Sequence, residues 1–393
     1  MREGFFDKEL EEAKTSDCTK CKLYQKCKSP RMKHSGKGEK GILIIGEAPS
    51  STEDKKGKAN VGQAGKILKL VLQKHGIDLH KDCWKINAVS CRPPEGKEPS
   101  KNHIKCCFPR VEKLIKKKKP HLTLVLGGAA LNSFLGTRLN EAPGGINKWR
   151  GFICPDQRYK TWMTSTFHPS HLLYNPDDKI LHNMFRRDIV AGLKRLNKDL
   201  PRYGDYKINI HRDEDELIAL LCHIQQSDPP ELFSFDYETT GLKPYVKGHE
   251  IVTCAFHIDK ETHAFRMTKK VAKYWKKILR DKHIPKTAQN LKFEHQWGRV
   301  VLGVVTRGWV WDTMQASHII DNRQGVTGLK FQAYANFGQE DYSSHLDKFI
   351  KTKKDVEFNK IHKAPIKDVL QYNGMDAVIE HYLAIKQMKE LIK

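Results

Sequence analysis

Residues 232–241 read LFSFDYETTG, an apolar run that leads into two carboxylates one residue apart, Asp236 and Glu238. Alternate side chains of a β-strand point to the same face, so a strand here places the two carboxylates side by side. Adjacent carboxylates repel each other and raise one pKa unless a cation lies between them, and a divalent metal ion is the usual choice. The pair predicts either a metal site with further acids downstream or a solvated strand end before the turn at residues 239–241.

Further acids follow in two segments that have the spacing of one helical turn. Asn290 and Glu294 are four residues apart, and so are Tyr372 and Asp376, which predicts that each pair shares one face of a helix. With the opening pair they make four candidate carboxylates. Each segment alone is more typical of exposed helix acids, but together and in this order they favour the metal site.

These acids and their neighbours resemble the DEDD-type 3'-5' exonucleases, especially the proofreading domains of family A DNA polymerases. The similarity covers about residues 206–393 and includes WDTMQASHIID (311–321) and GLKFQAYANFG (328–338). It implies a ribonuclease H-like mixed sheet that holds two Mg²⁺ or Mn²⁺ ions, with Asp312 as a supporting acid outside the metal set. Glu294 stands where Asp is commoner, which implies lowered activity. The implied site residues are the ligands Asp236, Glu238, Glu294 and Asp376, with Tyr372 orienting the attacking water and Asn290 beside the substrate.

The composition points to a polyanionic partner. The chain has 393 residues, a formal net charge of +24 and a pI of about 9.5; nucleic acid is the usual partner of so basic a protein, because each Lys or Arg that contacts a phosphate releases a counterion. No apolar run approaches the roughly 18 residues of a membrane span, and residues 1–14 lack the apolar core of a signal peptide. We therefore expect a cytoplasmic protein, in a bacterium or a phage-infected host, that makes no membrane contact. Its ten cysteines should be metal ligands or buried thiols.

The first half predicts a mostly parallel four-stranded α/β sheet with flanking helices. Ligands of such sheets bind at the carboxyl ends of the strands, so the loops that follow the strands should carry function. A phosphate-binding loop is excluded, because Gln63 stands where that motif requires Lys. The expected strands are 42–45, 84–89, 121–126 and 161–167, and a helix is expected at about 65–75.

Five motifs, in order, resemble the iron-sulfur (family 4 type) uracil-DNA glycosylases over about residues 18–193. They are CTKC (18–21), GEAPSSTED (46–54), GKANVGQAG (57–65), NAVSCRPP (87–94) with a later cysteine, and STFHPSHLLYNP (165–176). The resemblance implies a [4Fe-4S] cluster on Cys18, Cys21, Cys91 and Cys107. A zinc site on the same four thiolates is the alternative.

The implied chemistry is flipping of a base out of DNA, followed by cleavage of its N-glycosidic bond. By resemblance, His168 donates near O2 of the departing uracil anion, Asn87 contacts its pairing edge, and Glu47 lies beside the water and sugar. Two residues depart from the family pattern. Ser50 replaces a usual Gly, and Asn60 replaces an aromatic that stacks on uracil, an interaction typically worth about 1–3 kcal/mol. We therefore expect weaker binding of the flipped base.

The polar segment RLNKDLPRYGD (195–205) separates the halves, which predicts domains 1–200 and 201–393. We expect a DNA-processing enzyme that acts on single-stranded DNA or a primer 3' end, with both domains active. In a second hypothesis only the exonuclease acts and the first domain grips DNA. In a third the chain is a non-catalytic replication accessory, against which the four acids argue. A DNA polymerase subunit is the expected partner, because some phage DNA polymerases resemble this pair of domains with a polymerase domain attached.

Overall fold

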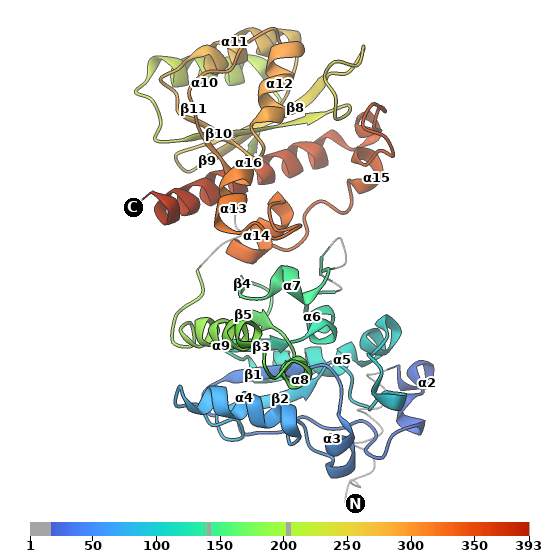
Figure 1. Ribbon diagram of the computed structural model, residues 1–393. Helices are drawn as coiled ribbons and strands as arrows, with labels where there is room; N and C mark the ends of the chain where they lie inside the picture. Colours follow the sequence, from blue (N-terminus) through green and yellow to red (C-terminus); the bar gives the residue numbers. More distant parts are fainter. Residues whose placement is uncertain (1–16, 137, 140–142, 202–205, 393) are drawn as a thin grey trace, which may run out of the picture. The chain divides into compact units, whose positions relative to one another are not determined.

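The computed structural model describes residues 17–136, 138–139, 143–201 and 206–392 (Figure 1). The chain forms two compact units that divide near residue 202, and the first also includes the segment Tyr334–Glu340. The charged N-terminal segment 1–14 lies outside the described residues. Within the described ranges, no helix is long and apolar enough to cross a membrane.

The first unit is built on a five-stranded sheet with the order β2-β1-β3-β5-β4. Its four parallel strands are those that the sequence predicts, and β4 adds an antiparallel edge next to β5. The sequence pattern does not reveal β4, because it is only four residues long and contains Pro155. The strands are β1 (Ile42–Gly46), β2 (Cys83–Asn87), β3 (Leu122–Leu126), β4 (Ile153–Asp156) and β5 (Thr161–Thr166).

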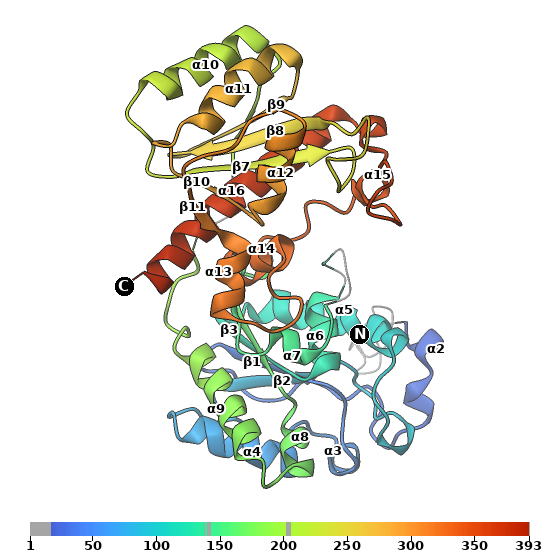
Figure 2. The ribbon, with the colours of Figure 1, turned by 45° about the horizontal axis from the view of Figure 1, so that its top comes forward.

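Helices cover both faces of this sheet (Figure 2). One face packs against α4, α8 and α9 through a core that includes Leu68, Leu172 and Phe185. Helices α5 and α6 pack together, and α6 contacts β1 and β3. The helices are α2 (Cys18–Cys21), α3 (Ser51–Lys56), α4 (Gln63–Gln73), α5 (Lys101–Lys118), α6 (Gly128–Leu135), α7 (Ile146–Trp149), α8 (Pro169–Tyr174) and α9 (Lys179–Leu193), with short 3₁₀ turns at Leu23–Gln25 and Pro94–Gly96.

The second unit is built on a six-stranded mixed sheet with the order β11-β10-β7-β8-β9-β6. β7, β8 and β9 are antiparallel neighbours, whereas β10 runs parallel to β7, β11 to β10 and β6 to β9. The short strand β6 forms one edge of this sheet, next to β9. The strands are β6 (Ile208–Ile210), β7 (Phe233–Thr239), β8 (Ile251–Ile258), β9 (Glu261–Arg266), β10 (Lys286–Ala288) and β11 (Trp309–Asp312).

Alternation along β7 decides which side chains form the site. Phe233, Phe235 and Tyr237 enter the core beneath α10 and α11, so Asp236 and Glu238 point to the opposite face of the sheet. Helix α16 covers that face (Figures 1 and 2). The helices are α10 (Glu214–Gln226), α11 (Lys269–Arg280), α12 (Lys292–Val300), α13 (Thr313–Ile320), α14 (Leu329–Phe337), α15 (Asp347–Ile350) and α16 (Ile366–Leu391), with a 3₁₀ turn at Ile361–Lys363.

Candidate active sites

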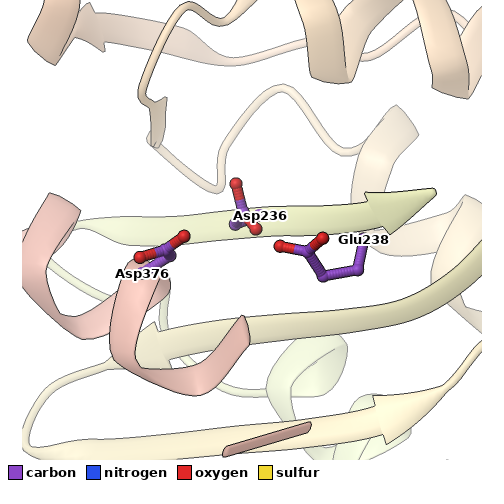
Figure 3. Close-up of side chains that lie close together, drawn as sticks. All are labelled: Asp236, Glu238 and Asp376. Atoms are coloured by element: carbon purple, nitrogen blue, oxygen red, sulfur yellow. The ribbon is translucent and has the colours of Figure 1, made fainter. Parts of the chain in front are cut away.

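Three acids of the second unit meet between β7 and α16. Carboxylate oxygens of Asp236, Glu238 and Asp376 lie within 4.8 Å of one another, and they form the one group of three or more potential metal-ligand atoms found in the described residues. Figure 3 shows Asp376 directed from the helix toward the two acids on the strand. The opening prediction of a paired-carboxylate site with a downstream partner is consistent with this geometry.

Burial and mutual repulsion make this group unfavourable without a cation. Burial raises the pKa of Asp236, and the Asp376 carboxylate raises it further, whereas the Lys330 ammonium lowers it. The pKa of Glu238 is raised by burial, then by Asp236 and Asp376, and is also lowered by Lys330. A divalent cation between the carboxylates relieves both effects, so the electrostatics favour metal binding.

Asn373 holds Asp236 in place. Its Nδ2 donates to the Asp236 carboxylate over 2.7 Å and to the Asp236 main-chain oxygen over 3.1 Å. Its Oδ1 accepts from the Thr253 hydroxyl on β8 over 2.9 Å. One fully buried amide therefore joins α16 to both β7 and β8.

Glu294 lies near this group but outside it. It is 1 % exposed, and its Oε2 has no hydrogen-bond partner. Burial and then the charge of Asp236 raise its pKa. A buried carboxylate oxygen without a partner is costly, so this atom is available to a cation or to a proton.

The prediction that Asn290 and Glu294 share one helix face is wrong. α12 begins at Lys292, and Asn290 precedes it with a φ of 63°. The cause is Asp312, whose carboxylate accepts the main-chain N–H groups of Asn290 and Leu291 and also caps α13. Asp312 thus has the supporting role expected of it.

Sequence reasoning missed three residues around Asp376. The Lys330 ammonium and the Tyr342 hydroxyl both donate to Asp376 Oδ1. Glu380 lies one turn after Asp376 on α16 and is fully buried. Neither of its carboxylate oxygens makes a well-formed hydrogen bond. Burial and then Asp236 raise its pKa, which the main-chain amide of Gln289 offsets only in part. The i, i+4 spacing from Asp376 could have revealed Glu380, but no local pattern indicates Lys330 or Tyr342.

In the first unit, two predicted site residues, Asn87 and His168, lie near each other at the carboxyl ends of the parallel strands. Asn87 ends β2 directly opposite Gly46 of β1. A Cβ atom at Gly46 would lie 2.5 Å from Asn87 Oδ1 and 3.9 Å from His168 Nε2. A glycine here leaves both polar groups facing the same small space.

The His168 ring presents an N–H to that space. Burial lowers its pKa to about 4, so the ring is neutral near pH 7. Its Nδ1 accepts the main-chain N–H of Ser170 at the start of α8 over 3.3 Å and lies 2.7 Å from the Ser170 hydroxyl. A neutral ring that accepts at Nδ1 carries its proton on Nε2. The neutral ring therefore donates from Nε2.

Three other predicted residues of this unit have structural partners. Glu47 Oε1 accepts the N–H of Ala129 near the start of α6, and burial raises the pKa of Glu47. Ser50 caps α3 in a reciprocal box with Glu53. The same Glu53 carboxylate accepts the N–H of Asn60, which has a φ of 57°. The two departures from the family pattern are thus joined through one carboxylate.

The predicted cysteine ligands lie in one region of the first unit. Cys91 and Cys107 are buried in a cluster against which Cys21 and Cys27 pack. Burial raises the pKa of Cys91 to about 12 and that of Cys107 to about 11. Cys107 also interacts electrostatically with Cys18 and Cys21.

Family models match the two halves separately. The uracil DNA glycosylase superfamily matches residues 33–194, and a 3'-5' exonuclease family matches residues 208–392. Among solved structures, *Escherichia coli* RNase D is 14% identical with a TM-score of 0.33, covering 48% of this chain and 45% of that one. NrnC of *Brucella melitensis* is 18% identical with a TM-score of 0.31, covering 47% of this chain and 79% of that one.

Curated relatives show the same division. The DNA polymerase of Bacillus phage SP01 is 24% identical over 74% of this chain, which spans 34% of the polymerase's length. The type-4 uracil-DNA glycosylase of *Pyrobaculum aerophilum* is 30% identical over 46% of this chain and 92% of that protein. That of *Saccharolobus solfataricus* is 35% identical over 43% of this chain and 79% of that protein. The chain therefore belongs to the type-4 uracil-DNA glycosylase family through its first half and carries a 3'-5' exonuclease domain in its second.

Proposed function

We propose that the second domain hydrolyses DNA from its 3' end, with Asp236, Glu238 and Asp376 as ligands of divalent cations and Glu294 completing the set. The observation that carries the proposal is the convergence of three carboxylates within 4.8 Å. A 3'-5' exonuclease domain implies a divalent metal, and the residues present fit one, because they offer hard oxygen ligands and Glu294 Oε2 has no other partner. The finer proposal is two Mg²⁺ or Mn²⁺ ions.

The protein residues position the reacting groups. When bound, divalent ions neutralise charge on the scissile phosphate and lower the pKa of the attacking water. Asn373 fixes the carboxylate of Asp236, and Tyr372 on α16 orients the water. The water oxygen bonds to phosphorus, the P–O3' bond breaks, and the departing 3' oxygen takes a proton. Asn290 adjoins the substrate.

A labelled-end assay tests this proposal. A 3'-labelled single strand should lose its label with Mg²⁺ but not with EDTA, and Asp236→Ala should abolish the loss. The matched control is Asp228→Ala, which removes an exposed carboxylate in the loop before β7. Metal-dependent loss that persists in Asp236→Ala would refute the site.

We further propose that the first domain excises uracil from DNA. The supporting observation is that His168 Nε2 and Asn87 Oδ1 both approach Gly46. The Nε2–H donates to uracil O2 as the N-glycosidic bond breaks and the base leaves as an anion, and Asn87 contacts the pairing edge. Glu47 lies beside the sugar and water, while Ser50 and Asn60 replace contacts that would hold the base more tightly.

Uracil-containing DNA distinguishes the two proposed activities. In EDTA, which leaves the exonuclease inactive, alkali should break the strand at uracil, and Asn87→Ala should reduce the breaks. If the wild-type protein produces no alkali-sensitive sites, the first domain instead binds DNA without catalysing uracil excision. In that case the exonuclease is the single activity of the chain, and it acts on a primer 3' end together with a DNA polymerase.

For the cysteines we propose a [4Fe-4S] cluster on Cys18, Cys21, Cys91 and Cys107. A tetrahedral zinc ion with bonds of about 2.3 Å requires thiolates only about 3.8 Å apart. No three cysteine sulfurs among the described residues lie within 4.8 Å of one another. Iron and acid-labile sulfide in the purified brown protein support the cluster, and stoichiometric zinc would refute it.

A further inference from the structure

Lys330 lies in a site built for a cation. It is the second residue of α14, and its Nζ donates to Asp376 Oδ1 and to the Tyr342 hydroxyl, the latter over 2.9 Å. The same Nζ lies 4.0 Å from the ring centroid of Tyr342 and 4.3 Å from that of Tyr372. One carboxylate, one hydroxyl and two aromatic faces therefore surround the ammonium.

The Tyr342 hydroxyl strengthens this arrangement, because it also donates to Asp376 Oδ1. That oxygen thus accepts two donors at once. The Asp376 side chain is only 8% exposed, whereas that of Lys330 is 41% exposed. The ammonium can therefore leave toward solvent, but the carboxylate cannot.

Lys330 is also the cation that offsets the acids of the group. Burial and neighbouring carboxylates raise the pKa of Asp236 and of Glu238, and Lys330 lowers both. A divalent ion at the same carboxylates would also lower these pKa values, and it carries twice the charge of an ammonium. It would also repel an ammonium that contacts one of its ligands.

We propose that Lys330 is a resident cation that competes with a divalent metal ion for the Asp376 carboxylate and thereby sets the metal affinity of the site. This inference rests on the proposed metal site. Metal binding breaks the Lys330–Asp376 ion pair, and the released ammonium moves toward its exposed side. The ion pair and the metal are alternative means of stabilising the same acids, so their effects on stability do not add.

Calorimetric titration with Mn²⁺ tests the competition without measuring catalysis. Lys330→Met should bind Mn²⁺ roughly tenfold more tightly than the wild type, because the competitor is gone. Lys330→Arg should stay near the wild-type affinity. The matched control is Lys348→Met. Lys348 Nζ also lies over an aromatic ring, 4.8 Å from the ring centroid of Phe349, but it is not one of the groups that change the pKa of Asp236 or Glu238. That variant should leave the affinity unchanged.

Thermal unfolding of the same proteins separates competition from a merely structural role. In EDTA, Lys330→Met should melt below the wild type, and saturating Mn²⁺ should close the gap. Equal Mn²⁺ affinities and a gap that persists with metal would overturn the inference while leaving the metal site intact. Binding by Lys330→Met but not by the wild type would support it in its strongest form. Absence of Mn²⁺ binding to both proteins would overturn the proposed metal site and this inference together.

Discussion

Replacement of Asn373 by Ala should destabilise the second domain strongly. The side chain is fully buried and makes three hydrogen bonds, two to Asp236 and one to Thr253. Neutral hydrogen bonds contribute about 1 kcal/mol each, and one to a charged group about 1.5–3 kcal/mol. We therefore expect a loss of about 4 kcal/mol in the free energy of unfolding. For a domain of this size that corresponds to a fall of roughly 10 °C in Tm.

The loss should also impair the site. Without Asn373, the Asp236 carboxylate loses the hydrogen bond that lowers its pKa and fixes its direction. We expect the exonuclease rate to fall at saturating Mn²⁺, beyond what the fraction of folded protein explains. End-label release well below the Tm of the variant measures this.

Thermal unfolding followed by circular dichroism, with the full chain in EDTA and in Mn²⁺, gives the stability change. Thr253→Val is the matched control, because it removes one neutral hydrogen bond and should cost about 1 kcal/mol. The double variant should cost about 1 kcal/mol less than the sum of the two, since both changes break the same bond. If Asn373→Ala costs no more than Thr253→Val, the assigned role of Asn373 is wrong.

Three further changes probe other parts of the molecule. Gly46→Ala places a Cβ 2.5 Å from Asn87 Oδ1, so uracil release should fall about a hundredfold while 3' label release is unchanged; equal losses would contradict this. Glu294→Gln replaces a buried carboxyl group whose ionisation burial opposes and whose Oε2 has no hydrogen-bond partner, so Tm in EDTA should rise while label release falls. Burial lowers the pKa of Lys286 from 10.5 to about 8, so the folded state loses its proton first as pH rises. The free energy of unfolding of the wild type, relative to that of Lys286→Met, should therefore rise by about 3 kcal/mol between pH 8 and 10.5. Urea unfolding at several pH values measures this difference, and a difference that does not change with pH would refute the assignment.

Local sequence indicates the four parallel strands of the first sheet and β7 of the second, because their patterns are strong. Apolar runs end in polar loops at each parallel strand of the first unit, and alternation along β7 separates Phe235 from Asp236. Family motifs cover both halves and identify them correctly. The i, i+4 spacing gives a wrong prediction at Asn290, because the main-chain N–H groups of Asn290 and Leu291 donate to the Asp312 carboxylate, about 22 positions further along the chain, and α12 begins only after them.

The sequence by itself determined the two-domain composition, the parallel strands of the first sheet, and the four acids of the candidate metal site. Only the tertiary structure decided which groups meet those acids. Packing of α16 on β7 and β8 brings Asn373 to Asp236 across 137 positions, and Lys330 reaches Asp376 from α14. Such contacts depend on the register and direction of packed elements, which burial of side chains across the whole domain determines, and no local pattern of residues records them.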